Sequence, residues 1–177
     1  MPRVSPPGLL SRPPRFGLTV PSPLGPLHLL ANGDALVSLR FAGESPAAED
    51  EAPTAPPHPV LGLAASQLAE YFAGERRRFS VPLHLAGTPF QQAVWQALQT
   101  VPYGEQRSYQ WLAAQVGRPR ATRAVGSANG RNPLPILVPC HRVIRADGSL
   151  GGYSSGLAIK HWLLAHEARC RGVAGSG

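Results

Sequence analysis

The chain has 177 residues and a formal net charge of +7, a length that fits one ordinary domain or two small ones. Its two cysteines are too few for a disulfide framework and lack paired zinc-ligand spacing, so no metal is expected. No stretch reaches the roughly 18–20 consecutive apolar residues of a membrane span, and early prolines interrupt any signal-peptide core, so we expect a cytoplasmic protein with no membrane partner.

The N-terminal part predicts a small antiparallel sheet. Residues 1–14 are Pro-rich, and we expect them to form a disordered tail. Three β-type runs then alternate with the turn-forming clusters PSPLGP and NGD, a pattern typical of antiparallel strands. The runs are Phe16–Val20, Leu27–Ala31 and Ala35–Phe41. The acidic, Pro- and Ala-rich segment 43–58 is expected to be a loop.

A helix is predicted next, over residues 60–74. Its apolar residues recur at spacings of three and four, which places them on one face, and Gly74 ends the pattern. The Ser80–Leu85 segment is a candidate strand that returns to the sheet. Residues 15–86 are therefore predicted to be a small α/β domain, and no catalytic motif lies within it.

Residues 87–170 predict a second, mainly helical domain, followed by a tail over 171–177. Thr88 and Pro89 supply a cap and a first helical turn, and apolar residues continue the helical spacing as far as Val101. The fold class expected for the whole chain is therefore two-domain α/β, with the sheet in the first domain and most helices in the second.

Two short helices joined by a tight turn are predicted inside the second domain. Ser108 caps a helix over Tyr109–Val116, and the turn GRPR leads to a third helix over about Ala121–Asn129. This is the pattern of a helix-turn-helix. Small residues dominate the third helix, either because it packs tightly inside the protein or because its backbone approaches DNA. Arg123 is the one long side chain near its centre.

The positive charge lies entirely in the C-terminal half. Residues 1–86 hold seven arginines and seven acidic residues, whereas residues 87–177 hold nine arginines and Lys160 against three acidic residues. No acidic residue lies between Glu105 and Asp147, a segment that contains seven arginines. A basic segment of this kind either binds a polyanion such as DNA or forms a solvated face. Charge alone leaves both explanations open.

A proline-rich segment leads to the first cysteine. Pro133, Pro135 and Pro139 forbid a regular helix and stiffen the approach to Cys140. The cysteine lies next to His141 and near arginines, an electropositive setting expected to lower the pKa of the thiol from its usual value of about 8.5. Neighbours in an extended chain point to opposite sides, so the two side chains need not touch. Cys140 is a candidate nucleophile, and a buried, inert cysteine is the alternative.

The segment NPLPILVPCHRV, which contains Cys140, resembles the active-site signature of the 6-O-alkylguanine-DNA alkyltransferases. Other motifs of that family occur in the same order from about Phe90 to Glu167: FQQAVW, VPYGEQRSY and RAVG before the cysteine, then GYS and KHWLLAHE. Residues 15–86 match only loosely, like the variable N-terminal domain of the family. The resemblance implies a ribonuclease H-like N-terminal domain and a winged-helix-like active-site domain.

The same resemblance implies a DNA repair reaction. In this family a cysteine takes the alkyl group from the 6-oxygen of guanine, or the 4-oxygen of thymine, and keeps it, without a cofactor. Cys140 is the implied acceptor, His141 the base that acts through a water molecule, and Glu167 the acid that orients the imidazole. Tyr109 is the implied proton donor to N3 of the leaving guanine.

Further residues are implied to hold the base. Tyr153 covers it and Ser154 supports its 6-oxygen. The carbonyl groups of Cys140 and Val143 accept hydrogen bonds from its exocyclic amine. Asn132 braces the turn that leads to the cysteine.

DNA binding is implied to place the third helix in the minor groove. The alkyl group lies inside the base stack, so the nucleotide must rotate out of the duplex. Arg123 is the implied finger that fills the vacated space, and Ala124, Ser127 and Tyr109 are implied DNA contacts. The expected partner is double-stranded DNA with alkylated bases, bound by a monomer.

Three features depart from the family or lie outside its motifs. No cysteine precedes Cys140, so the zinc site of some members' N-terminal domains is not expected. His161 stands where relatives often have an acid or arginine, and Cys170 lies beyond the matched region; neither is assigned a role. Two other functions are alternatives, of which the hydrolase uses the same three residues. A damage sensor would not need the acceptor cysteine, and a Cys-His-Glu hydrolase would leave the basic helix pair unexplained.

Overall fold

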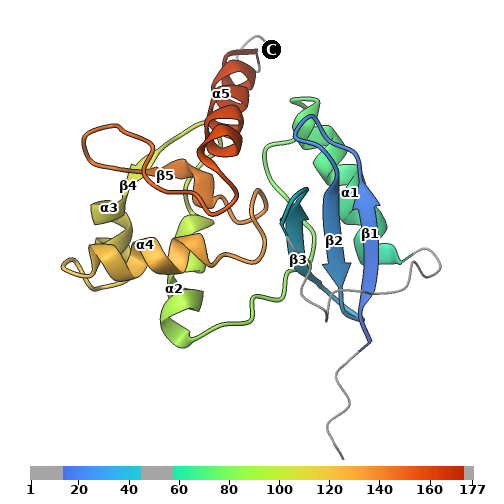
Figure 1. Cartoon of the computed structure of the whole chain (residues 1–177), viewed down its shortest axis with the longest axis horizontal. Helices are drawn as coiled ribbons and strands as arrows, with labels where there is room; N and C mark the ends of the chain where they lie inside the picture. The colour runs from blue at the N-terminus through green and yellow to red at the C-terminus, as the bar shows by residue number, and fades with distance from the viewer. Residues whose placement is uncertain (1–13, 45–57, 174–177) are drawn as a thin grey trace, which may run out of the picture.

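The computed structural model describes residues 14–44 and 58–173. A sheet with one helix lies beside a helical part, and the C-terminal helix lies near both (Figure 1). The tail predicted over 1–14 and the loop predicted over 43–58 fall almost wholly outside the described residues. Within the described ranges, no helix combines the length and apolar character that crossing a bilayer demands.

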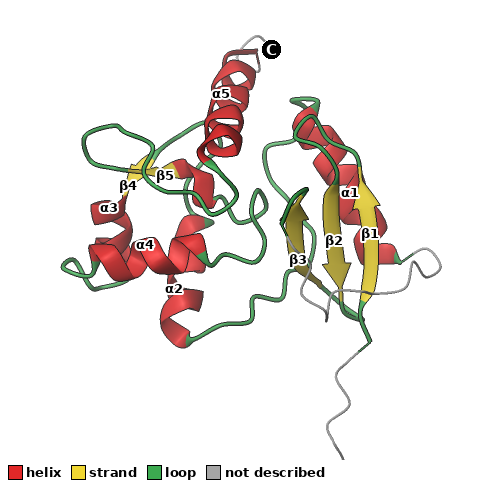
Figure 2. Cartoon of the chain, in the orientation of Figure 1, coloured by secondary structure: helices red, strands yellow, loops and turns green. Residues whose placement is uncertain are grey.

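The N-terminal part is a three-stranded antiparallel sheet packed against one helix, as predicted (Figure 2). The elements are β1 (Phe16–Val20), β2 (Leu27–Ala31), β3 (Leu36–Phe41) and α1 (Pro59–Phe72). In β2, Leu27 and Leu29 are buried while His28 between them is exposed, the alternation expected of a strand with one face on a core. On α1, the side chains buried against the sheet include Leu61, Ala64 and Leu68.

The strand predicted over Ser80–Leu85 does not form. Its contact with the sheet is a single bridge, in which the Leu36 N–H donates to the Pro82 carbonyl oxygen at 2.8 Å and the His84 N–H donates to the Leu36 carbonyl oxygen at 2.9 Å. Pro82 has no N–H to offer a ladder, so the pairing does not extend. The segment instead runs from the sheet to the helical part.

The C-terminal part holds four helices and two short strands. They are α2 (Pro89–Leu98), β4 (Arg107–Ser108), α3 (Tyr109–Gln115), α4 (Thr122–Gly130), β5 (Val143–Ile144) and α5 (Leu157–Val173), and β4 pairs with β5 in parallel. The Thr88 side chain accepts from the Gln91 N–H and the Gln91 side chain accepts from the Thr88 N–H, which closes a capping box on α2. Helices α3 and α4 pack together, which confirms the predicted helix-turn-helix.

The small residues of α4 lie on two opposite faces of the helix. Val125 and Ala128 are buried towards α2, where the Trp95 Nε1–H donates to the Ala128 carbonyl oxygen at 2.9 Å. Ala124 and Ser127 are exposed on the outer face. The buried face of α4 therefore carries small side chains that permit close packing, and its exposed face carries small side chains as well.

The predicted start of the C-terminal tail at residue 171 is wrong, because α5 continues to Val173. Cys170 lies in this helix and packs at the end of α1: a Cβ atom added to Gly74 would stand 2.8 Å from the Cys170 Sγ. The Arg77 guanidinium also donates to the Cys170 carbonyl oxygen at 3.2 Å. These long-range contacts support the last turns of the helix.

Candidate active site

The chain reaches Cys140 through a strained turn. Ile136 has a φ of 75°, a conformation that β-branched residues seldom adopt, and its side chain is buried. Asn132 holds the turn together: its Nδ2 donates to the Val138 carbonyl oxygen at 2.8 Å, and its Oδ1 accepts from the Leu134 N–H at 2.9 Å. Strain of this kind persists where surrounding bonds enforce it. The backbone before the cysteine is therefore fixed in place.

Cys140 begins a single 3-10 turn, η1 (Cys140–Arg142), instead of the extended chain expected from the sequence. Its Sγ lies 4.0 Å from the Tyr153 hydroxyl, and the side chain is only 4% exposed. Burial raises the pKa of the thiol, although Asn132, Tyr153 and the charge of Lys160 oppose the shift. The expected lowering of the thiol pKa is therefore wrong, because burial outweighs nearby positive charge.

His141 is fully buried beside Glu167, with 2.6 Å between His141 Nε2 and Glu167 Oε2. Burial lowers the pKa of His141, and the Glu167 carboxylate offsets this only in part. The imidazole is therefore neutral near pH 7, donates its Nε2–H to Glu167 and carries a lone pair on Nδ1. Nδ1 has no hydrogen-bond partner among the described residues, so its lone pair can accept a proton.

Glu167 accepts hydrogen bonds from four residues. Besides His141, Arg142 donates its Nε to Oε1 at 2.7 Å, the Gly104 N–H donates to Oε1 at 3.2 Å, and the Tyr71 hydroxyl donates to Oε2 at 2.7 Å. Burial by itself raises the pKa of a carboxyl group, but His141 and Arg142 together hold the pKa of Glu167 well below its usual range. The carboxylate therefore stays charged at neutral pH.

Lys160 fixes the loop that follows the cysteine. Its buried ammonium group donates to the carbonyl oxygens of Val143 at 2.7 Å, Gly152 at 3.3 Å and Leu150. Burial lowers the pKa of Lys160 to about 8, while the Cys140 side chain acts in the opposite direction. One cation thus ties both ends of the loop to α5 and places positive charge near the sulfur.

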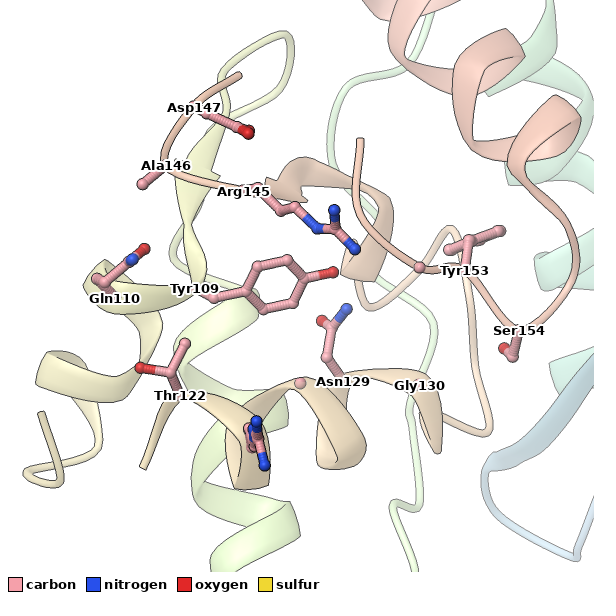
Figure 3. Close-up of a pocket in the computed structure, with 13 residues that line it drawn as sticks. Tyr109, Gln110, Thr122, Asn129, Gly130, Arg145, Ala146, Asp147, Tyr153 and Ser154 are labelled. Carbon is pink, nitrogen blue, oxygen red and sulfur yellow. The ribbon is translucent and has the colours of Figure 1, made fainter. Parts of the chain in front are cut away.

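A cavity of about 890 Å³ opens between α4 and the loop after β5 (Figure 3). Tyr109 crosses it, with Arg145 on one side of the ring and Asn129 near the hydroxyl end (Figure 3). Burial raises the pKa of Tyr109, and so does the Cys140 side chain, whereas Arg145 lowers it. The phenol is therefore protonated near pH 7 and has a proton to donate.

Cys140 itself lines a smaller, adjoining cavity of about 340 Å³. Gly130 and Ser154 line both cavities, so the two spaces are neighbours. The wall of the smaller cavity also includes residues from β3 and the turn after it, where the Glu44 Oε1 accepts from the Ser155 hydroxyl at 2.7 Å. The sulfur therefore lies where the two parts of the molecule meet.

The site residues predicted from the sequence lie in different parts of the structure. His141 and Glu167 form a buried, hydrogen-bonded cluster, and Cys140, which precedes His141 in the chain, is also buried. Those lining the larger cavity are Tyr109, Arg123, Tyr153 and Ser154. Arg123, Ala124 and Ser127 are exposed together on α4. Val143 is buried and lines neither of these cavities; its carbonyl oxygen already accepts from Lys160, as that of Cys140 accepts from Asn129 Nδ2 at 3.3 Å.

Two residues of the cluster have no role in the sequence analysis. Arg142 appears there only as a letter of the cysteine motif, yet it binds Glu167 and donates its Nη1 to the Val101 carbonyl oxygen at 2.8 Å. Tyr71 lies 96 residues from Glu167 along the chain and belongs to the apolar stripe of the predicted helix. No local pattern distinguishes it from a core tyrosine. Within the described ranges, no group of three His, Cys, Asp or Glu side chains is arranged to hold a metal.

Comparison with protein families matches both parts of the chain. Residues 17–85 match the domain described as "6-O-methylguanine DNA methyltransferase, ribonuclease-like domain". Residues 89–169 match "6-O-methylguanine DNA methyltransferase, DNA binding domain". Among similar proteins, the methylated-DNA–protein-cysteine methyltransferase of Mycobacterium bovis is 50% identical over 149 residues, 84% of this chain and 90% of that protein. The constitutive enzyme of Bacillus subtilis is 51% identical over 153 residues, 84% of this chain and 93% of that protein.

Solved structures agree with these matches. The O6-methylguanine methyltransferase of Mycobacterium tuberculosis superposes with a TM-score of 0.80 at 47% identity, over 88% of this chain and 93% of that one. The same organism's protein in complex with DNA gives a TM-score of 0.79 at 48% identity, over 86% and 92%. By its two matched domains and its identity to these enzymes, the chain belongs to the methylated-DNA–protein-cysteine methyltransferase family.

Proposed function

We propose that this protein repairs duplex DNA by moving the alkyl group of 6-O-alkylguanine, and of 4-O-methylthymine, to the sulfur of Cys140. The observation that carries the proposal is a cysteine that directly precedes the histidine of a buried histidine–carboxylate pair and lines a cavity sharing residues with a larger one, which has room for a base. The methylated-DNA–protein-cysteine methyltransferases to which the chain is similar support the substrate class.

The reaction begins with removal of the thiol proton. His141 Nδ1 takes this proton through a water molecule, and the imidazolium is stabilised by the Glu167 carboxylate at Nε2. The raised pKa of the thiol and the lowered pKa of His141 favour the neutral pair before substrate binds. The thiolate therefore forms only as the reaction requires it, which limits oxidation and unwanted alkylation of the sulfur.

Alkyl transfer is then a single displacement. The sulfur attacks the alkyl carbon, a sulfur–carbon bond forms, and the carbon–oxygen bond breaks with its electron pair left on the guanine. Tyr109 donates its hydroxyl proton to N3 of the leaving base, so the departing group is neutral guanine. The product is a thioether, which nothing in the site can cleave. Each molecule therefore acts once, without a cofactor.

Recognition of the base requires that it leave the duplex. We assign the larger cavity to the everted base, with Tyr153 over the ring and Ser154 at its 6-oxygen. By the family resemblance we also assign the Cys140 and Val143 carbonyl groups to the exocyclic amine, although neither residue lines that cavity. The Cys140 carbonyl oxygen already accepts from Asn129 Nδ2 and from the Val143 N–H, and that of Val143 accepts from Lys160, so at Cys140 the base replaces or shares one of these bonds. Asn132 braces the turn that presents the sulfur.

DNA contacts come from the outer face of α4. Ala124 and Ser127 present small side chains to the minor groove, and the exposed Arg123 enters the stack in place of the rotated base. Tyr109, the first residue of α3, lines the cavity, and we assign it a DNA contact as well. The proposal includes a monomer that acts in the cytoplasm, and a division of the chain into domains at residues 15–86 and 87–170.

The test is a count of transfers. Limiting protein is incubated with excess duplex that carries 6-O-methylguanine labelled in the methyl group. We expect a plateau near one label per protein and a methyl increment on the peptide with Cys140. Cys140→Ser should take up no label, whereas the matched control Cys170→Ser should keep the plateau near one. Repeated turnover would contradict the proposal in favour of a hydrolase, and tight lesion binding without transfer would favour a damage sensor.

A further inference from the structure

A side chain of the N-terminal part reaches the catalytic pair. Tyr71, from the last turn of α1, is completely buried, and its hydroxyl donates to Glu167 Oε2 at 2.7 Å. The His166 Nε2 bonds the Tyr71 carbonyl oxygen at 2.8 Å, and the Tyr103 ring meets the Tyr71 ring edge-on with centroids 6.1 Å apart. Backbone and ring are thus held from two sides, so the hydroxyl has one direction in which to point.

Tyr71 and His141 donate hydrogen bonds to the same carboxylate oxygen of Glu167. Glu167 Oε2 lies 2.6 Å from His141 Nε2 and 2.7 Å from the Tyr71 hydroxyl, with Arg142 Nη2 at 3.1 Å. Each donor draws electron density from the same carboxylate oxygen. A hydrogen bond from one donor therefore makes the oxygen a weaker acceptor for the other donors. The strength of the Tyr71 bond therefore affects how well Glu167 stabilises a protonated imidazole.

We propose that Tyr71 is a positioning residue for alkyl transfer, whose hydroxyl limits the proton affinity of His141 by sharing Glu167 Oε2. This inference rests on the proposed function for its meaning in the reaction, but the tuning itself is a property of the unreacted protein. It gives the N-terminal part, which contains no catalytic motif, a direct connection to the chemistry. The neutral histidine described above is then kept neutral by burial and by this tyrosine together.

Other charged and titratable groups face the same cluster. Around His141 and Glu167 they are Arg142 and Cys140 from η1, Lys160 and His166 from α5, and Tyr103 from the loop after α2. His166 also carries an imidazole and touches Tyr71, so a pH profile alone does not assign a response to His141. The experiment therefore needs a measurement that resolves each imidazole.

The first measurement is the pKa of His141 from its ring resonances in ¹⁵N-labelled full-length protein. Tyr71→Phe removes the hydroxyl and keeps the ring, so we expect the pKa of His141 to rise by about 0.5–1 unit, the effect of losing one competing hydrogen bond. Tyr103→Phe is the matched control: it removes a hydroxyl from the neighbouring ring, which makes no described hydrogen bond to Glu167, and should leave His141 unchanged.

A second variant keeps the packing intact if Tyr71→Phe does not fold. A fluorinated tyrosine placed at position 71 is a stronger donor of nearly the same shape, so the pKa of His141 should fall. The pH dependence of the single-turnover rate should follow, with its acid limb at higher pH for Tyr71→Phe and at lower pH for the fluorinated residue.

A His141 pKa that does not respond to donor strength at position 71 would overturn the proposal and leave Tyr71 a packing residue. Failure of the proposed function has a different signature, because wild-type protein would then take up no methyl label while the His141 titration still responded.

Discussion

The cluster around Glu167 and the cavity around Tyr109 use charge in opposite ways. In the cluster, Arg142 and Glu167 are buried and bonded to each other at 2.7 Å, and further donors complete the carboxylate. At the cavity, Arg123 and Arg145 are exposed. Buried charges require partners within the fold, whereas exposed cations remain available to a polyanion. The fold therefore holds the buried cluster in place before substrate binds, and it leaves the exposed arginines free to bind DNA.

The largest effect that would test this contrast is on stability. Glu167→Ala leaves the buried guanidinium of Arg142 without its carboxylate, so the free energy of unfolding should fall by about 3–5 kcal/mol. Urea denaturation measures it. The matched control is Glu105→Ala, which breaks a half-exposed pair with Arg107 at 2.7 Å and should cost no more than about 1 kcal/mol. Similar losses in both variants would show that the cluster is not prearranged as described.

The next effect concerns the exposed side. If Arg123 fills the space left by the rotated base, Arg123→Ala should slow methyl transfer from duplex DNA about 10- to 100-fold, since flipping a base costs a few kcal/mol. Transfer from a free 6-O-alkylguanine base should change less than about twofold, and stability by less than about 0.5 kcal/mol. Single-turnover rates on the two substrates measure the ratio.

Arg118→Ala is the control for loss of charge. Arg118 lies in the turn before α4 and packs over the Phe90 ring at 5.3 Å, away from the cavity lining. It should lower duplex affinity slightly and leave the ratio of the two rates unchanged. An Arg123→Ala variant that reacts equally slowly with duplex and free base would remove the finger role.

The smallest effect is the pH dependence of stability. The pKa values of His141 and Glu167 are both lowered in the folded protein, so the unfolded chain binds their protons first as the pH falls. The free energy of unfolding should therefore decrease below about pH 6.5 through His141 and again below about pH 4.3 through Glu167. Urea midpoints across this range measure both steps. His141→Gln should remove the upper step, and its persistence would assign that step to another histidine.

Much of the fold followed from local patterns in the sequence. The strands at Phe16–Val20 and Leu27–Ala31 and the start of α3 at Tyr109 are where the turn residues and the Ser108 cap predicted them. These elements are short and bounded by residues with strong local preferences. The failed strand at Ser80–Leu85 depended instead on pairing with distant residues, which one missing N–H at Pro82 prevents.

The sequence located the candidate site but did not reveal its electrostatics. The cysteine motif identified Cys140 and His141, whereas the thiol pKa moves upward because burial of the sulfur is a tertiary property. Arg142 follows the cysteine by two residues, yet its guanidinium bonds to Glu167. Tyr71 shows the same limit, because an apolar stripe on a helix does not reveal that one of its hydroxyl groups meets a carboxylate 96 residues away.

The position of the sulfur in the smaller cavity has a consequence for the protein after it reacts. That cavity is walled by both halves of the molecule and closed on one side by the Glu44–Ser155 hydrogen bond. A transferred alkyl group remains there for the lifetime of the chain, as added volume at the seam. Each protein molecule that has reacted thus keeps an alkyl group where its two halves join, and the size of that group equals the size of the alkyl group removed from the DNA.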